Sequence, residues 1–195
     1  MKVYIVHDFK ASVTTHWYAW LADQVITLGH QCEIVQLADS EQPQAVIWRQ
    51  NLEQQIKPLN EQVIVIGHGL GCLSTMDYLS QALKGCSLKA LLLVAGFRTR
   101  LPSLPELNQL IDQCSVDDAL IRIKVQQRYV FFSTNDSFVP APFSIRLGQL
   151  INAQMIEVTK AGHFMQEDGY QTFSELWSRL QVLLQHDFLM NDVAS

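Results

Sequence analysis

Short runs rich in branched apolar residues alternate with longer amphipathic stretches along the chain. The runs have the length and the near-continuous apolar character of strands that are buried on both faces of a sheet. They predict strands at residues 2–6, 31–37, 63–66, 88–95, 128–132 and 154–158. The longer stretches have apolar residues at helical spacing and predict helices at residues 16–28, 43–57, 70–83, 141–150 and 170–185. Such alternation is typical of an α/β fold in which helices cover both faces of a parallel sheet.

One stretch, residues 98–125, breaks this alternation. It contains Pro102 and Pro105, followed by short helix-like segments, and it is too long for a plain connection. We therefore expect a small cap or lid there. The length of 195 residues suits a single domain, residues 1–195, with one core and a frayed tail at residues 191–195.

The composition argues against several classes of protein. The net charge of −5 leaves no basic stripe for a nucleic-acid backbone. No apolar run is long enough to cross a membrane, and the apolar residues after Lys2 are too few for a secretory signal. The cysteines lack the spacing of a zinc site or a disulfide framework: Cys32, Cys72, Cys86 and Cys114. We expect a cytoplasmic protein with reduced cysteines and no metal or other cofactor, and the sequence identifies no protein partner.

Chemistry in such a fold belongs in the loops after the strands, because ligands bind outside the carboxyl ends of the strands. The loop after the third predicted strand reads GHGLG at residues 67–71. Its glycines fit a nucleophile elbow, G-x-S-x-G, with the serine replaced. A dinucleotide loop would need glycine at Cys72 and an acidic residue that is absent from residues 78–97, and a phosphate loop would need a following Gly-Lys-Ser/Thr. A turn that uses glycine only for its geometry is the remaining alternative.

The nucleophile elbow is favoured by two residues further along the chain. In hydrolases that use this elbow, the triad follows the order nucleophile, acid, histidine. The matching positions are Gly69, Asp136 and His163, and the last two each follow a predicted strand. A single aspartate or histidine in a loop is usually solvated surface, but both in this order indicate a pair. We expect Asp136 to hydrogen-bond His163 near residue 69, with the other nitrogen of His163 free.

Several segments together carry a resemblance to a known family. They are VYIVH at 3–7 with WYAWL at 17–21, GHGLGC at 67–72, LVAGF at 93–97 with LP at 101–102, Asp136 with VP at 139–140, and GHF at 162–164. Over nearly its whole length the chain resembles the small serine hydrolases of the retinoblastoma-binding-protein-9 family and their bacterial relatives. The resemblance implies an α/β-hydrolase fold with a six-stranded parallel sheet, and esterase-type hydrolysis of small acyl substrates.

Two positions depart from the pattern of that family. Gly69 stands where the family has its nucleophilic serine, and Asp8 follows His7 where the family has a glycine. Loss of the serine removes the atom that would form the acyl-enzyme, while glycine relieves the backbone strain of an elbow. Asp8 brings negative charge close to the loop that is expected to bind an oxyanion. We expect an inactive or strongly impaired esterase that Gly69→Ser reactivates, with a further gain from Asp8→Gly.

The remaining site residues are expected around this elbow. The backbone N–H groups of Leu70 and of Phe9 or its neighbour are expected to form the oxyanion hole, because the residue after the nucleophile normally donates. The expected pocket residues are His7, Asp8, His68, Phe97 and Phe138. The residues considered as substitutes for the serine, and disfavoured by their positions, are Ser12, Cys72 and Ser74.

Three functions stay open at this point. The chain is a binding or regulatory module without serine chemistry, or hydrolyses weakly through a water held by His163 and Asp136, or is an ordinary esterase in which residue 69 is a variant. A small ester-like molecule is the expected ligand. A metal bound by His7, His163 and Asp136 is conceivable, but no spacing in the sequence marks such a site.

Overall fold

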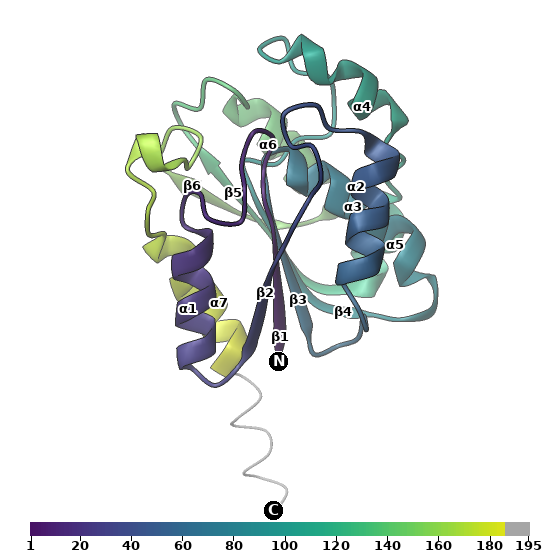
Figure 1. Ribbon diagram of the computed structural model, residues 1–195, viewed down its shortest axis with the longest axis vertical. Helices are drawn as coiled ribbons and strands as arrows, with labels where there is room; N and C mark the ends of the chain where they lie inside the picture. Colours follow the sequence, from purple (N-terminus) through teal and green to yellow (C-terminus); the bar gives the residue numbers. More distant parts are fainter. Residues whose placement is uncertain (186–195) are drawn as a thin grey trace, which may run out of the picture.

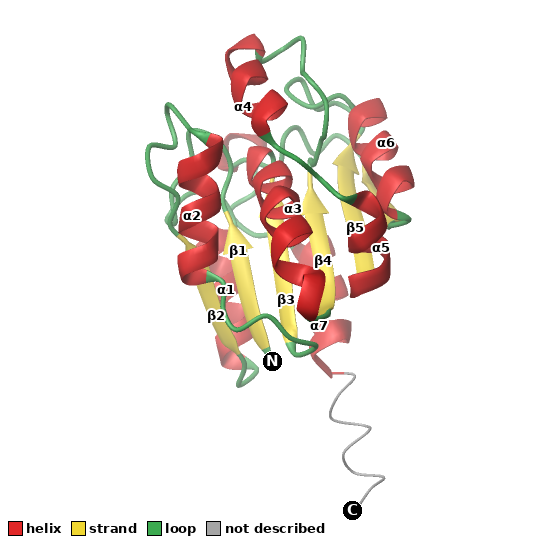
Figure 2. Cartoon of the chain, turned by 90° about the vertical axis from the view of Figure 1, so that its right-hand side faces the viewer, coloured by secondary structure: helices red, strands yellow, loops and turns green. Residues whose placement is uncertain are grey.

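Six strands form one central sheet in the computed structural model, which describes residues 1–185 (Figures 1 and 2). They are β1 (Lys2–Val6), β2 (Gln31–Val35), β3 (Val63–His68), β4 (Leu88–Val94), β5 (Val125–Ser133) and β6 (Gln154–Val158). The strand order is β2-β1-β3-β4-β5-β6, and every neighbouring pair is parallel. The prediction of an α/β fold with a six-stranded parallel sheet is therefore confirmed. The tail expected to be frayed, residues 191–195, lies outside the described residues.

Helices connect the strands. They are α1 (Tyr18–Thr27), α2 (Ala45–Gln55), α3 (Leu70–Ala82), α4 (Asn108–Gln113), α5 (Asp118–Lys124), α6 (Ala141–Ile151) and α7 (Ser174–Gln185), with 3₁₀ turns η1 (Leu83–Gly85), η2 (Pro105–Leu107) and η3 (Gln166–Asp168). Within residues 1–185, none of them has both the length and the apolar character that crossing a membrane requires.

The last helix begins later than the sequence predicts. Tyr170 and Phe173 precede α7 and pack their rings against Phe164, with ring centroids 5.2 and 5.0 Å apart. These rings anchor the segment after His163 to the core. Tyr170 and Phe173 continue the apolar spacing of the helix, but they belong to the loop that positions His163.

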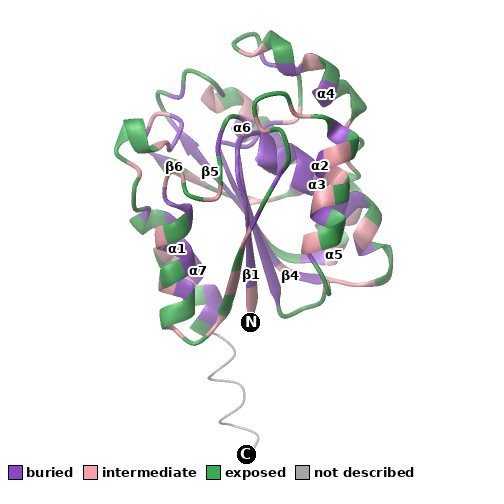
Figure 3. Cartoon of the chain, viewed as in Figure 1, coloured by how far each residue is buried: buried purple, intermediate pink, exposed green. Residues whose placement is uncertain are grey.

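Two apolar cores lie on the two faces of the sheet. One core joins the sheet to α2, α3, α5 and α6, through residues such as Trp48, Leu73 and Leu147. The other joins it to α1 and α7, through residues such as Leu21 and Leu180. Figure 3 shows the central strands β1, β3 and β4 buried between these helices, whose outer faces are exposed, while the edge strands β2 and β6 are partly exposed. This burial on both sides explains why β3 and β4 are near-continuous apolar runs.

The region expected to be a cap divides into two parts. Figure 2 shows α4 above the carboxyl ends of the strands, while α5 lies lower, beside the sheet. The η2 turn and the residues before it bring Leu104 and Leu107 over the same edge. Only the first half of residues 98–125 therefore covers the loops where a site is expected.

The strand order changes direction between β1 and β3. The chain leaves β1 toward β2 on one side, and leaves β3 toward β4 on the other. A crevice forms outside the carboxyl ends of two strands at such a switch point. The residues that follow β1, including Asp8, therefore lie beside the residues that follow β3, including Gly69.

Candidate active site

The turn between β3 and α3 has the backbone of a sharp elbow. Gly69 has φ 51° and ψ −119°, a conformation that costs about 1–3 kcal/mol for residues other than glycine. Its N–H donates to the carbonyl of Val94, 2.9 Å away, which ties the turn to the neighbouring strand. A Cβ atom at Gly71 would lie under 3.0 Å from the backbone carbonyls of Val6 and His7. The glycine at residue 71 therefore lets the end of β1 approach the elbow closely.

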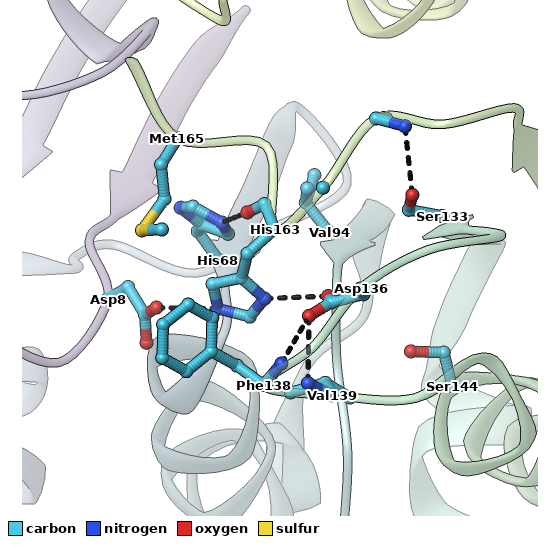
Figure 4. A network of polar contacts seen from close by, with 12 residues as sticks. Asp8, His68, Val94, Ser133, Asp136, Phe138, Val139, Ser144, His163 and Met165 are labelled. Carbon is cyan, nitrogen blue, oxygen red and sulfur yellow. Dashed lines mark hydrogen bonds and ion pairs between the residues drawn. The ribbon is translucent and has the colours of Figure 1, made fainter. Parts of the chain in front are cut away.

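Asp136 and His163 meet beside this elbow (Figure 4). His163 Nδ1 lies 2.7 Å from Asp136 Oδ2, although 27 positions separate the two residues in the sequence. Asp136 Oδ1 accepts hydrogen bonds from the backbone N–H groups of Phe138 at 2.8 Å and Val139 at 2.9 Å. These donors hold the carboxylate so that its second oxygen faces the imidazole. The expected hydrogen bond between Asp136 and His163 is present.

The second nitrogen of His163 is not free, so this part of the sequence-based prediction is wrong. His163 Nε2 lies 3.0 Å from Asp8 Oδ2. The imidazole therefore lies between two carboxylates, and only a doubly protonated ring can donate to both. The expectation failed because nothing in the sequence showed that the side chain of Asp8 turns into the elbow.

The carboxylate of Asp8 occupies the space of the missing serine side chain. A Cβ atom built on Gly69 would lie under 3.0 Å from Cγ, Oδ1 and Oδ2 of Asp8, closer than Cβ atoms come to other atoms. Asp8 Oδ1 accepts from the N–H of Leu70 at 2.6 Å and from the N–H of Phe9 at 2.7 Å. These are the two amides that the sequence nominated for an oxyanion hole. In this structure they bind the protein's own anion.

The charges in this cluster stabilise one another. Burial alone would lower the pKa of His163, but the hydrogen bonds to Asp136 and Asp8 raise that pKa to about 10. Burial would raise the pKa of Asp8, but the hydrogen bond and positive charge of His163 lower it to about 2. At neutral pH the site therefore contains an imidazolium in contact with the ionised carboxylate of Asp8.

His68 and Tyr18 form a chain of hydrogen bonds that reaches the backbone N–H of Asp8. His68 Nε2 donates to the carbonyl of His163 at 2.7 Å, so Nδ1 accepts from the hydroxyl of Tyr18 at 2.6 Å. The Tyr18 oxygen in turn accepts from the N–H of Asp8 at 3.3 Å. Burial lowers the pKa of His68 to about 3, which keeps this ring neutral.

His7 fixes the other side of the Asp8 backbone. Its Nε2 accepts from the N–H of Leu37 at 3.1 Å, so Nδ1 carries the proton and donates to the carbonyl of Asp8 at 2.8 Å. With these contacts, every polar group of Asp8 has a partner. Asp8 is therefore held in a single orientation by contacts from α1, from α3 and from the loop that carries His163.

A small apolar cavity of about 120 Å³ opens onto Asp8 and His163. Its lining includes the expected residues Asp8, Phe97 and Phe138. His7 and His68, which were also expected there, are buried and do not line the cavity. Sequence reasoning missed the cap residues Leu104 and Leu107, because no motif or periodic pattern in residues 98–125 marks them. A larger groove of about 580 Å³ between α2 and α4 is lined mainly by amide, acidic and apolar side chains and lies away from His163.

The three residues considered as substitutes for the serine lie elsewhere. Ser12 is exposed in the loop after β1, where its hydroxyl bonds with Thr14. Cys72 is fully buried, and burial raises the pKa of its thiol well above the usual range. Ser74 is buried within α3. None of them lines the cavity above His163.

Asp8, His68 and His163 are close enough to form a metal site, with ligand atoms within 4.8 Å of one another. Both nitrogens of His68 already have partners, one in a carbonyl group and one in a hydroxyl. Both nitrogens of His163 face carboxylates. A metal needs an unprotonated nitrogen aimed at it, so this arrangement favours an ion-pair network over metal binding.

Comparison with known proteins gives consistent matches. A family model described as serine hydrolase matches residues 3–182. The YdeN protein of Bacillus subtilis (strain 168) is 33% identical over 169 residues, which cover 87% of this chain and 88% of that protein. The serine hydrolase RBBP9 of Rattus norvegicus is 25% identical over 172 residues, which cover 86% and 89% of the two chains. The crystal structure of the B. subtilis ydeN gene product has a TM-score of 0.90 at 31% identity, over 94% of this chain and 98% of that chain.

Proposed function

This chain belongs to the serine hydrolase family, and on that premise we propose that it is a small α/β-hydrolase without working serine esterase chemistry. The observation that carries the proposal is the position of the Asp8 carboxylate against Gly69. The nucleophile position, the two amides and the second nitrogen of His163 are all engaged by this one side chain. As a hydrolase of small acyl esters, the chain is therefore inactive or strongly impaired.

Three requirements of serine catalysis are unmet at this site, and each of them supports the proposal. Position 69 has no hydroxyl to attack an ester, and loss of such a serine costs a serine protease roughly 10⁶-fold in kcat. An oxyanion needs free N–H donors, but those of Leu70 and Phe9 donate to a negative oxygen. A general base needs an unprotonated nitrogen, and Nε2 of His163 is protonated at neutral pH.

The same contacts weigh against hydrolysis by a water that His163 activates directly. That water would have to replace the carboxylate of Asp8 at Nε2, and it would meet a protonated ring. Binding of a small ester-like molecule in the apolar cavity above Asp8 remains part of the proposal, because Phe97 and Phe138 line that cavity. We place the protein in the cytoplasm, because the spacing of its cysteines suggests reduced thiols.

Restoring serine chemistry tests this function. Gly69→Ser alone puts a side chain into the space of the Asp8 carboxylate, so we expect little gain in p-nitrophenyl acetate hydrolysis. The Asp8→Gly/Gly69→Ser double variant frees Leu70 and Phe9 and supplies a hydroxyl beside His163. Its hydrolysis rate should exceed that of the unchanged chain by at least about 10³-fold, with labelling by a fluorophosphonate.

The controls separate this outcome from trivial ones. His163→Ala in the double variant should abolish both labelling and the gain in rate. If the unchanged chain hydrolyses the ester at the rate of the double variant and loses that activity with His163→Ala, the proposal is wrong.

A further inference from the structure

Asp8 leaves one hydrogen-bonding position open to the cavity that it lines, and that position is an acceptor. Oδ1 of Asp8 accepts from the N–H groups of Phe9 at 2.7 Å and Leu70 at 2.6 Å, so both of its lone pairs are engaged. Among the described residues, Oδ2 accepts only from Nε2 of His163, at 3.0 Å. The second lone pair of Oδ2 is therefore available to a ligand.

The donors around the cavity are already in use. The lining residues other than Phe97 donate their backbone N–H groups to acceptors within the protein. Both nitrogens of the His163 ring donate to carboxylates. Lys10 also lines the cavity, but it is exposed and its ammonium lies 4.7 Å from the centre of the Phe9 ring. The groups at the elbow that could hold a ligand carbonyl, the N–H of Leu70, the N–H of Phe9 and Nε2 of His163, are thus all occupied.

This polarity is opposite to that of a serine esterase, whose site offers donors to a substrate carbonyl. We propose that the cavity binds small apolar alcohols, aryl or short-chain, through a hydroxyl group that donates to Oδ2 of Asp8. The inference rests on the proposed function and narrows its ligand, because an ester-like molecule then fits only if it also carries a hydroxyl group.

The charges beside Oδ2 favour a neutral donor. An ammonium group there would meet the positive charge of His163, whose Nε2 lies 3.0 Å from the same oxygen. A ligand carboxylate would meet the negative charge of Asp8. An amide has a neutral N–H, but it would also bury a carbonyl oxygen without a partner. A hydroxyl group avoids these costs, and its hydrogen bond to a carboxylate is about twice as strong as one between neutral groups.

The size of the cavity limits the rest of the ligand. It measures about 120 Å³, and its apolar lining includes Phe97, Leu104, Leu107, Phe138 and Met165. An apolar cavity of about 150 Å³ holds one benzene molecule. Figure 4 shows Phe138 and Met165 beside the contact between Asp8 and His163. A single aromatic ring, or an alkyl group of similar size, next to the hydroxyl group fits this space.

Two ligands with the same carbon skeleton test the proposal. 1-Phenylethanol has a hydroxyl group where acetophenone has a carbonyl. Each is titrated into the purified full chain, and its dissociation constant is obtained from ¹H–¹⁵N NMR shifts. We expect 1-phenylethanol to bind at least about 10-fold more tightly, because only this ligand can donate to Oδ2. The largest shifts should include the N–H groups of Phe9 and Leu70, which share the carboxylate with the ligand.

Asp8→Asn should reverse this preference. The asparagine carbonyl can still accept from Phe9 and Leu70, while its NH₂ group offers a donor where Asp8 has Oδ2. Acetophenone should then bind about 3-fold or more tightly than 1-phenylethanol. Asp23→Asn is the matched control at an exposed position in α1, and it should leave both dissociation constants unchanged.

Equal dissociation constants for the two ligands in the unchanged chain would overturn the proposal. So would the absence of shifts with either ligand, or shifts centred on Gln109 and Gln113 in the larger groove. This comparison depends on no variant, so it decides the question even if Asp8→Asn fails to fold. Labelling by a fluorophosphonate, or ester hydrolysis that His163→Ala removes, would instead refute the proposed function, so the two failures are distinguishable.

Discussion

Two loops of this protein use the same local arrangement for different ends. Gly69 and Gly162 both have positive φ, 51° and 57°, and a Cβ atom on either would collide with an aspartate carboxylate. That carboxylate accepts from the N–H of the residue after the glycine: Asp8 from Leu70 at 2.6 Å, and Asp168 from His163 at 2.8 Å.

The difference lies in what surrounds each carboxylate. Asp168 is exposed, and its Oδ2 also accepts from the N–H of Met165, so it braces the loop that carries His163. Asp8 is buried and faces an imidazolium and a cavity. The same carboxylate-to-turn contact is thus an exposed brace in one loop and part of a buried ion pair beside a cavity in the other.

The largest effect on stability should come from removing the positive charge of His163, which contacts the carboxylate of Asp8. His163→Gln leaves Asp8 and Asp136 as buried carboxylates without a counter-charge. We expect the free energy of unfolding in urea to fall by about 3–5 kcal/mol. In an Asp8→Asn background the same substitution should cost clearly less, because one of the unpaired charges is already gone. Equal losses in both backgrounds would show that Asp8 and His163 are not coupled.

The coupled charges also predict a pH dependence. The pKa of His163 is raised from 6.5 to about 10, so its contribution to stability is complete below pH 6.5 and is lost as the pH rises to about 10. The pKa of Asp8 is lowered from 3.8 to about 2, so its contribution is present above pH 3.8 and is lost as the pH falls to about 2. Urea unfolding should show a loss on the order of 3 kcal/mol between pH 6.5 and 10.

Asp8→Asn is the control for this dependence, because it removes one of the two carboxylates that hold the proton on His163. The alkaline loss of stability should shrink in that variant. An unchanged chain whose unfolding free energy stays flat from pH 6.5 to 10 would contradict a charged His163.

Replacing each of the two glycines with alanine should lower the stability by different amounts, because the new Cβ atom meets a different carboxylate in each loop. Gly69→Ala forces Cβ into a buried carboxylate that two backbone N–H groups and the imidazole of His163 hold, so we expect a loss of about 2–3 kcal/mol. Gly162→Ala meets an exposed Asp168 that can rotate away, so about 1 kcal/mol is expected.

The double variant Gly69→Ala/Asp8→Ala sharpens that comparison. Removing the carboxylate relieves the collision, so the cost of Gly69→Ala should drop to that of the strained backbone alone. If the cost of Gly69→Ala is the same with and without Asp8, the two side-chain positions do not share one volume.

The smallest effect on stability should come from changing Asp168, the exposed carboxylate that holds the loop of His163. Asp168→Asn keeps an oxygen acceptor for His163 N and Met165 N, so stability should fall by about 1 kcal/mol or less. The pH dependence set by His163 should stay unchanged, as NMR titration of its imidazole can show. A shift in that titration as large as the one from Asp8→Asn would mean that both carboxylates act on the ring.

Much of the fold follows from the sequence because buried parallel strands are near-continuous apolar runs. The strand at 154–158 agrees at both ends, whereas β5 begins at Val125, before the predicted 128, because Gln126 and Gln127 are exposed and polar. The meeting of Asp136 with His163 was also predictable, since both follow neighbouring parallel strands.

The position of Asp8 inside the elbow was not predictable in the same way. The sequence shows a carboxylate after the first strand, but the direction of its side chain depends on contacts with residues far along the chain. Tyr18, Gly71 and His163 set that direction, through a hydroxyl, a missing Cβ and an imidazole. A motif records which residues are present, whereas this site depends on how two loops share one small volume.

That shared volume also constrains how the chain can change by single substitutions. A serine introduced first at residue 69 would meet the carboxylate of Asp8 and destabilise the fold. A glycine introduced first at residue 8 should avoid that collision and leave the N–H groups of Leu70 and Phe9 free. Mutational paths between a serine at the elbow and the aspartate seen here therefore have a preferred order, and their midpoint is a protein with neither side chain in the shared volume.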